Sequence, residues 1–333
     1  MVDGHILGRG ARWFGSFACA LLALLSLVWI GRDLTVTGSL PDLWWSWTGL
    51  PADRPDGVLV SSLYDPVLVV VYAVAAATAI RSSAAAGILG CAAVVTVALR
   101  VPGLWALNED WLRAPGGLDS ELRNQALLSA GAAATLATVL LISVAAARRP
   151  ADADTGYGLL SPEERPPPAP GDAAAFVASF FLWVAAVGIG GWTVYDAVDT
   201  GWSAYWHQLT GEGTLGSLLQ PPPAYGKWFT VGLCLTAAVG ALLRAPLSRP
   251  MGMTASALVL GLGGADTARQ LRAKVFEDFG ALPTDRALSV ITALVLLLAG
   301  FAALWALAGR APEDPMAQPL TGWRESGSAP PNW

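Results

Sequence analysis

Two aspartates occupy equivalent places in a sequence pattern that the chain contains twice. Asp33 lies in the first copy of W-x3-D-x3-T-G and Asp196 lies in the second. Carboxylates related in this way can together coordinate a cation or a cationic ligand. Because an arginine also recurs in each half, the sequence favours a structural ion pair between Asp33 and Arg100. The matching pair in the second half is Asp196 with Arg269.

A second acidic pair also occurs twice. Glu109 and Asp110 follow the third apolar segment of the first half, and Glu277 and Asp278 follow the corresponding segment of the second. Paired carboxylates can act as general acid and base or hold a divalent metal, but both tasks normally need a further ligand or a cleft. We interpret these residues as solvated loop charges or helix caps, with ligand binding as the alternative.

Two tryptophans and one histidine form the third group of candidates. Trp44 and Trp206 match between the two copies, and each begins the pattern W-x3-T-G. Their rings either form the core of a small cap or offer stacking faces to a sugar or a lipid headgroup. The fixed spacing before a turn favours the cap core. His207 has no histidine counterpart in the first copy, and a single loop histidine is usually exposed or hydrogen-bonded.

The chain carries no catalytic or nucleotide-binding motif in a supporting context. Patterns such as G-x-S-x-G, H-E-x-x-H and the P-loop do not occur. The sequence GLGG at 261–264 lies in an apolar segment, where it indicates close helix packing. Cys19, Cys91 and Cys234 all lie in apolar runs, so neither a disulfide nor a cysteine metal site is predicted. We therefore predict no catalytic residue, no cofactor and no metal.

Composition identifies lipid as the solvent of most of the chain. Of 333 residues, 54% are hydrophobic and 14% are charged, and the mean hydropathy is +0.51; soluble domains have about 25% charged residues. A net charge of −5 without a basic cluster argues against nucleic acid as a partner. Lysine occurs only at Lys227 and Lys274, while Ala, Gly, Pro and Arg abound. This bias indicates a high-GC, actinobacterium-like source.

Eight apolar segments approach the length of about 20 residues that a helix needs to cross a bilayer. They are 13–30, 66–80, 84–101, 126–147, 174–195, 228–243, 251–265 and 287–308, of which the second, sixth and seventh are short. No Asp, Glu, Lys, Arg or His lies at mid-depth in any of them. Because transport of protons and embedded hydrolysis usually require such residues, a proton-coupled pump and an embedded hydrolase are disfavoured.

Arginines in short loops indicate the orientation of the helices. They lie, nearly free of acidic neighbours, before the first segment and after the second, fourth, sixth and eighth, as at Arg9, Arg81, Arg148, Arg244 and Arg310. Loops on the other side mix arginine with aspartate and glutamate. We therefore expect a multi-pass protein of the bacterial plasma membrane with both termini in the cytoplasm.

Internal repetition is the strongest feature of the sequence. Both copies of W-x3-D-x3-T-G are followed by W-x3-T-G. The register persists beyond these motifs, because 48 positions separate the repeated aspartate from the arginine after the next apolar segment in each half. Repeats with an even number of spans share one orientation and are related by an axis along the membrane normal.

The predicted fold is an all-α polytopic membrane protein, with eight transmembrane helices in two tandem parallel four-helix repeats. The long first loop of each repeat forms a small extracytoplasmic cap. The predicted domains are 1–149, the first repeat; 150–172, a cytoplasmic Pro-rich linker; 173–310, the second repeat; and 311–333, a disordered cytoplasmic tail.

Three functions are compatible with this sequence. The leading hypothesis is a non-enzymatic scaffold or accessory subunit whose cap binds a membrane or envelope protein, a glycan or a lipid. The alternative is a permease or exporter of an apolar or zwitterionic molecule, with its path between the two repeats. The third is a membrane-bound enzyme acting on a lipid-linked substrate, which requires a cleft that brings Asp196, His207 and Glu277 together.

Overall fold

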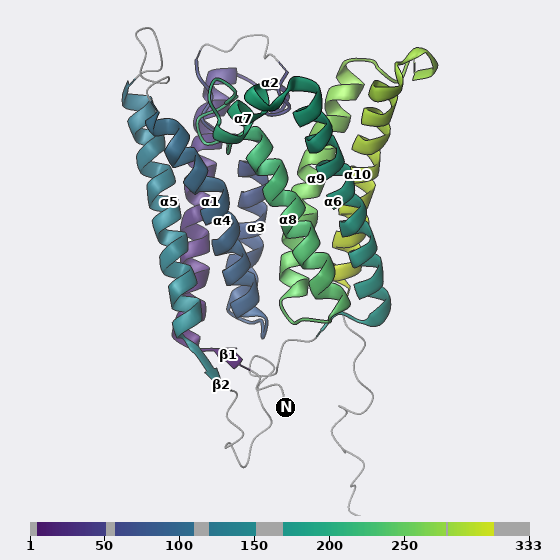
Figure 1. The fold of residues 1–333 in the computed structure, drawn as a ribbon. Helices are drawn as coiled ribbons and strands as arrows, with labels where there is room; N and C mark the ends of the chain where they lie inside the picture. Colours follow the sequence, from purple (N-terminus) through teal and green to yellow (C-terminus); the bar gives the residue numbers. More distant parts are fainter. Residues whose placement is uncertain (1–4, 51–56, 110–119, 151–168, 278, 310–333) are drawn as a thin grey trace, which may run out of the picture.

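The computed structural model describes residues 5–50, 57–109, 120–150, 169–277 and 279–309, which are almost entirely helical (Figure 1). The first half contains α1 (Arg9–Thr37), α2 (Leu40–Trp47), α3 (Tyr64–Ala79), α4 (Ala85–Asn108) and α5 (Ser120–Ala146). The second contains α6 (Asp172–Thr200), α7 (Trp202–Thr210), α8 (Pro223–Leu242), α9 (Ser248–Arg272), the 3-10 turn η2 (Phe279–Ala281) and α10 (Thr284–Ala308). Long and short α-helices therefore follow one another in the same order in both halves.

Each of the eight predicted apolar segments lies on one of the longer helices, apart from single residues at the ends. Six helices, α1, α4, α5, α6, α8 and α10, are long and apolar enough to cross a membrane. This is the architecture of a multi-pass helical membrane protein. α3 has only 16 residues. α9 has 25 residues but is rich in Gly, Ser and Thr, and because it packs against helices of both halves, less of its surface needs to be apolar.

The recurring T-G pairs end helices. Gly38 and Gly201 follow α1 and α6 with φ of 73° and 81°, and Gly49 and Gly211 lie just after α2 and α7 with φ of 82° and 90°. Glycine enters this left-handed region without steric cost, so each pair stops a helix and turns the chain. The short helices α2 and α7 then lie across the same end of the long helices (Figure 1), which we call the α2/α7 end.

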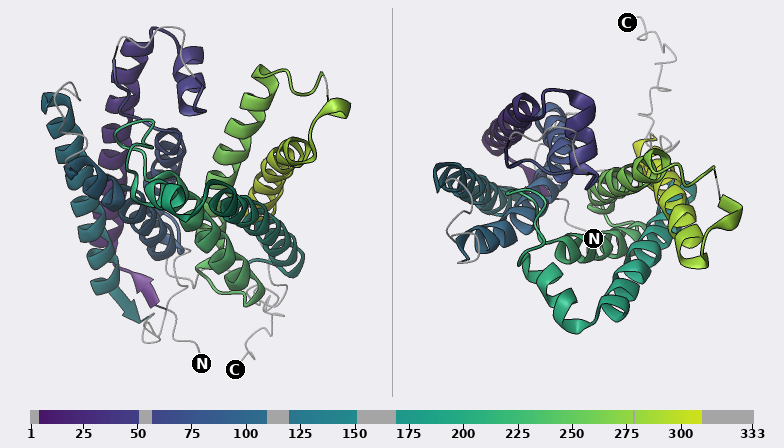
Figure 2. Two further views of the ribbon diagram at one scale, coloured as in Figure 1. Left: turned by 45° about the horizontal axis from the view of Figure 1, so that its top comes forward. Right: turned by 90° about the horizontal axis from the view of Figure 1, so that it is seen from above.

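The long helices form two groups that lie side by side, α1, α3, α4 and α5 in one and α6, α8, α9 and α10 in the other (Figure 2). The groups meet where α9 packs against α3 and α4. Small residues permit this close approach: Gly261 of α9 faces Val67, and Gly87 of α4 faces Leu247 and Pro250. The interpretation of GLGG as a packing element is therefore confirmed.

One feature departs from the predicted all-α fold. β1 (His5–Leu7) and β2 (Arg148–Pro150) form a two-stranded antiparallel sheet in which Leu7 is opposite Arg148. The sheet joins the segment before α1 to the segment after α5, at the end opposite α2 and α7 (Figure 1). Three-residue strands are too short to show the alternation by which a strand is detected in a sequence. Most of the predicted linker and all of the predicted tail, at 151–168 and 310–333, lie outside the described residues.

Candidate functional site

A pocket of about 330 Å³ lies at the α2/α7 end, between the two groups of helices. Its walls come from the end of α2, from residues 59–64 leading into α3, from the loop residues 214–220, and from α8 and α9. Hydroxyl, amide and charged side chains make up much of the lining, whereas the helices below are mostly apolar. Ligand sites are typically concave and hold a few placed polar groups, so this pocket is the candidate functional site.

The second half supplies the charges of the pocket. Lys227 on α8, and Asp266 and Arg269 on α9, line it. Arg269 Nη2 lies 2.9 Å from Asp266 Oδ1, and Lys227 Nζ lies 2.9 Å from Oδ2 of Asp196 on α6. All four side chains are between 34% and 49% exposed. The predicted pair of Asp196 with Arg269 is therefore not formed, because each of them has a nearer partner.

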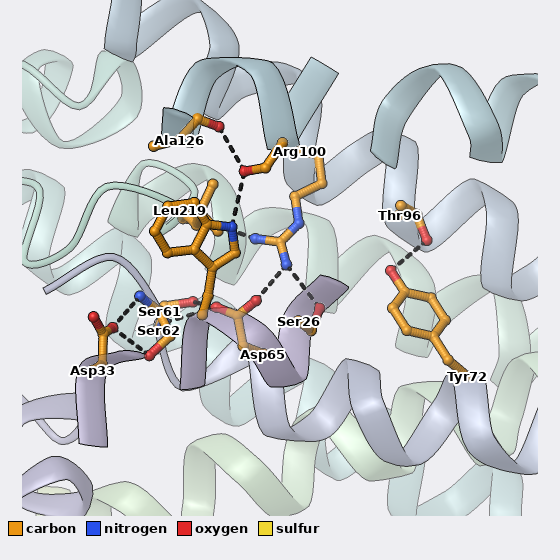
Figure 3. Close-up of polar contacts among 12 residues, drawn as sticks. Ser26, Asp33, Ser61, Ser62, Asp65, Tyr72, Thr96, Arg100, Ala126 and Leu219 are labelled. Carbon is orange, nitrogen blue, oxygen red and sulfur yellow. Dashed lines mark hydrogen bonds and ion pairs between the residues drawn. The ribbon is translucent and has the colours of Figure 1, made fainter. Parts of the chain in front are cut away.

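The first half supplies a wall that Asp33 holds in place (Figure 3). Asp33 is fully buried, and its Oδ2 accepts hydrogen bonds from the backbone N–H groups of Val60 (2.9 Å) and Ser61 (2.5 Å) and from the Ser61 hydroxyl (2.7 Å). Its Oδ1 lies 2.8 Å from Arg32 Nη1. Both oxygens are thus occupied by the protein, and Asp33, which is not among the residues that line the pocket, positions its wall.

A second buried carboxylate, Asp65 in the first turn of α3, forms an ion pair with Arg100 of α4 (Figure 3). Asp65 Oδ2 also accepts hydrogen bonds from the backbone N–H (2.7 Å) and the hydroxyl (3.0 Å) of Ser62. Arg100 donates further to the carbonyl of Leu219 (3.2 Å) and to the hydroxyl of Ser26 on α1 (3.4 Å). One guanidinium therefore joins α1, α3, α4 and the loop before α8.

The predicted pair of Asp33 with Arg100 is consequently not formed. Arg100 meets α1 at Ser26, which lies seven residues before Asp33, or about 10 Å along a helix axis. The two charges sit at different levels of the bundle. Asp65 on the neighbouring helix is at the level of Arg100 and takes the place predicted for Asp33.

The predicted position of Arg100 at the outer end of its apolar segment differs from the structure, in which α4 continues well beyond this residue. Arg100 lies eight residues before Asn108, the last residue of α4, about 12 Å from the helix end. Its side chain is 5% exposed. The predicted segment ended at 101, and this early end placed Arg100 at the membrane boundary. A buried charge without a partner is costly, so the arginine depends on Asp65.

A loop of the second half pairs with the segment of the first half that leads into α3. The backbone N–H groups of Leu218 and Leu219 donate to the carbonyls of Leu59 (3.1 Å) and Val60 (2.9 Å). Val60, Leu218 and Leu219 also join Trp29 of α1 in a buried apolar cluster with residues of α4 and α5. The pocket wall is therefore held by backbone pairing between the halves as well as by Asp33 and Arg100.

Two further side chains give the wall its polar character. Trp47 of α2 lines the pocket and donates from Nε1 to the Ser61 hydroxyl at 3.1 Å. Ser217 also lines the pocket, and its buried hydroxyl makes no hydrogen bond to another described residue. Because buried hydroxyl groups normally have a partner, Ser217 is a site at which a ligand or a water molecule can bind.

The cap has a different core from the one predicted. α2 buries Leu43 and α7 buries Tyr205, each of which directly precedes a matched tryptophan. Trp44 is half-buried, whereas Trp206 is 52% exposed and its ring centroid lies 6.2 Å from that of Trp202. Neither Trp44 nor Trp206 lines the pocket.

The other predicted candidates are not brought together. His207 Nδ1 lies 2.8 Å from Oε2 of Glu212, and both side chains are exposed. Glu109 follows α4, and the exposed Glu277 has Lys274 as a neighbour at 3.6 Å. Asp110 and Asp278 lie outside the described residues. His207, Asp196 and Glu277 each have a different partner, so the cleft required by the enzyme hypothesis is not seen among the described residues.

Sequence reasoning missed three charged residues that matter here, Asp65, Lys227 and Asp266. Each had a signal. Lys227 is one of only two lysines in the chain and immediately precedes an apolar segment. Asp65 and Asp266 immediately flank predicted segments, at 66–80 and 251–265. A search for charges just outside each apolar segment, on the side away from the arginine-rich turns, would have found all three.

Comparison of the chain with protein-family models, with curated proteins and with solved structures finds no match. What the chain does is therefore inferred from the pocket and the helices around it.

Proposed function

We propose that this chain is a non-enzymatic membrane protein that binds a small zwitterionic molecule in the pocket between its two halves. The observation that carries the proposal is the balanced set of charges at the pocket. Lys227 and Arg269 are cationic, Asp266 is anionic, and Asp196 lies directly behind Lys227. A ligand with one positive and one negative group can pair with both the anionic and the cationic side chains. A singly charged ligand leaves the side chains of its own sign without a partner.

The existing contacts allow such an exchange. The Asp266 and Arg269 side chains are 44% and 49% exposed, and ion pairs of this exposure contribute only about 0–1 kcal/mol. A ligand can therefore separate them at little cost and gain charge-assisted hydrogen bonds with each. The Ser217 hydroxyl adds a neutral partner from the loop before α8.

The distribution of arginines supports a position of this pocket outside the cytoplasm. Arg9, Arg81, Arg148, Arg244 and Arg249 all lie at the end opposite α2 and α7, and short arginine-rich connections are typically cytoplasmic. We propose that both termini are cytoplasmic, that α2 and α7 are extracytoplasmic, and that the protein resides in a bacterial plasma membrane.

We also propose that the two halves arose by duplication and that α3 and α9 complete eight spans. The helix order, the 29-residue length of both α1 and α6 and the T-G helix ends support a duplication. α3 is short, but the segment of residues 57–63 lies above it within the bundle and extends the first half to the α2/α7 end.

Ligand binding can be measured as a rise in melting temperature of the purified protein in detergent. We expect alanine, whose ammonium and carboxylate groups can form hydrogen bonds with Asp266 and Arg269, to stabilise the protein, and acetate and methylammonium, which carry a single charge, to have less effect. Arg269→Gln and Asp266→Asn each remove one charge from the pocket. A charge-assisted hydrogen bond contributes about 1.5–3 kcal/mol, so each variant should bind the zwitterion at least about tenfold more weakly.

The matched control is Glu277→Gln, which removes an exposed charge at the same end outside the pocket. It should leave binding unchanged. If the singly charged analogues stabilise the protein as well as the zwitterion does, or if Arg269→Gln retains full affinity, the proposed recognition is wrong.

A permease is the second candidate, and the position of a second cavity favours it. A groove at the opposite end also lies between the two groups of helices. Close packing separates the two cavities, and Cys91 of α4 touches Thr254 of α9 there, with 3.5 Å between Sγ and Oγ1. Movement of α9 against α4 would connect the cavities.

This contact permits a direct test of the permease. Thr254→Cys places a thiol beside Cys91, so oxidation can lock α4 to α9. For a permease, uptake of labelled alanine into proteoliposomes should stop on oxidation and return on reduction. A binding protein without transport activity would show no uptake in either state while retaining the thermal shift.

A further inference from the structure

The groove at the end opposite α2 and α7 has a volume of about 860 Å³ and is lined by α3, α4, α9 and α10. Most of its lining is apolar. Val70 and Val74 of α3 face it and are 58% and 46% exposed. An apolar surface of this kind along membrane-spanning helices is solvated by lipid chains, because its exposure to water would cost about 25 cal/mol per Å².

Cationic and hydroxyl groups occupy one end of the groove. Arg81, Ser82 and Ser83 form part of the turn between α3 and α4 and line the groove there. Arg81 is exposed. No Asp or Glu occurs among the described residues that line the groove.

Arg249 of α9 contributes a second guanidinium from the other group of helices. It caps the end of α10, with Nε donating to the carbonyl of Leu307 (2.7 Å) and Nη2 to those of Ala308 and Gly309. A guanidinium has five N–H donors, and these three bonds involve only Nε and Nη2. The arginine can therefore hold α10 and still present positive charge to the groove.

We propose that this groove binds an anionic phospholipid. One acyl chain lies along Val70 and Val74, and the phosphate meets Arg81 and the charge of Arg249. The combination of an apolar channel with cationic groups at one end matches a lipid, which carries both features in one molecule, better than it matches a free anion. The inference requires only that the helices span a membrane, and it is independent of the ligand in the pocket at the α2/α7 end.

Native mass spectrometry of the purified protein can test the inference. The full chain is titrated with phosphatidylglycerol and, separately, with phosphatidylcholine that has identical acyl chains. Phosphatidylglycerol should bind more tightly, and Arg81→Gln should weaken its binding about fivefold, since one arginine near an anionic lipid surface contributes about that factor. Binding of phosphatidylcholine should change little in this variant.

Two further variants separate the groove from general surface charge. Arg148→Gln removes an exposed arginine from the same end that does not line the groove, and it should leave the lipid preference intact. Val74→Trp, or the milder Ala77→Leu, fills the groove. Each should weaken the binding of both lipids while the protein still elutes as a single species. The inference is overturned if the protein binds the two lipids with equal affinity, or if Arg81→Gln binds phosphatidylglycerol as tightly as the unmodified protein does. It is also overturned if Arg148→Gln loses as much affinity as Arg81→Gln, or if the filled variants bind both lipids fully.

Discussion

Removal of Asp65 tests the role of the buried ion pair. In Asp65→Ala, Arg100 would keep two neutral acceptors among the described residues, the Leu219 carbonyl and the Ser26 hydroxyl. Its side chain is 5% exposed, so water cannot replace the lost carboxylate without opening the bundle. Breaking one partner of a buried pair typically costs about 3–5 kcal/mol. We expect a loss of this size in the free energy of unfolding.

Unfolding of the purified protein in mixed micelles, followed by tryptophan fluorescence, provides the measurement. The double variant Asp65→Ala/Arg100→Met removes both charges, and it should be more stable than Asp65→Ala alone, because no unpaired charge remains buried. Asp172→Ala is the control. Asp172 pairs with Arg244 between side chains that are 75% and 58% exposed, and its loss should cost about 0–1 kcal/mol.

The contrast between these variants makes the reasoning refutable. If Asp65→Ala costs no more than Asp172→Ala, Arg100 is hydrated and the pair is not a buried one. If the double variant is less stable than the single one, the charges contribute net stability as a pair, and the penalty does not come from an unpaired arginine.

Three further predictions concern packing and hydrogen bonding. Gly263→Ala should destabilise the protein by about 1–3 kcal/mol, because a Cβ there would lie 2.6 Å from a backbone nitrogen of α10, whereas Gly264→Ala, with nothing nearer than 3.9 Å, should have little effect in the same unfolding assay. Asp33→Ala should reduce the yield of folded protein on size-exclusion chromatography far more than Asp196→Ala, because the Asp33 carboxylate is fully buried and accepts four hydrogen bonds, whereas Asp196 is 34% exposed. Trp29→Phe deletes the hydrogen bond from Nε1 to a serine hydroxyl of α5 at 3.0 Å and should lower the free energy of unfolding by about 1 kcal/mol. A variant as stable as the unmodified protein would contradict this prediction.

Much of the helical architecture was predictable from the sequence. Length and hydropathy located every long helix, because a segment surrounded by lipid must be apolar and must satisfy its backbone hydrogen bonds internally. The W-x3-T-G pattern predicted a turn, and glycine alone readily takes the φ values found at Gly49 and Gly211. Both signals are local, and each depends on a few neighbouring residues.

The site was less predictable, because it depends on the levels at which different helices meet. Asp65 and Arg100 are 35 positions apart, and nothing in either flanking sequence shows that α3 begins beside the interior of α4. The assumed symmetry also misled the assignment of partners. Asp33 and Asp196 are matched in sequence, yet one fixes the backbone of a pocket wall and the other binds a lysine.

The loop that carries Leu218 and Leu219 has a consequence for the biosynthesis of the protein. These residues are translated more than a hundred positions after Arg100, so the N-terminal helices enter the membrane before the carbonyl of Leu219 and its backbone partners exist. During that interval the first group of helices lacks the hydrogen bonds that this loop makes to Arg100 and to the backbone of residues 59 and 60, and Asp65 is the charged partner that Arg100 has. The N-terminal half expressed by itself should therefore be short-lived in the cell, and co-expression of the C-terminal half should extend its lifetime.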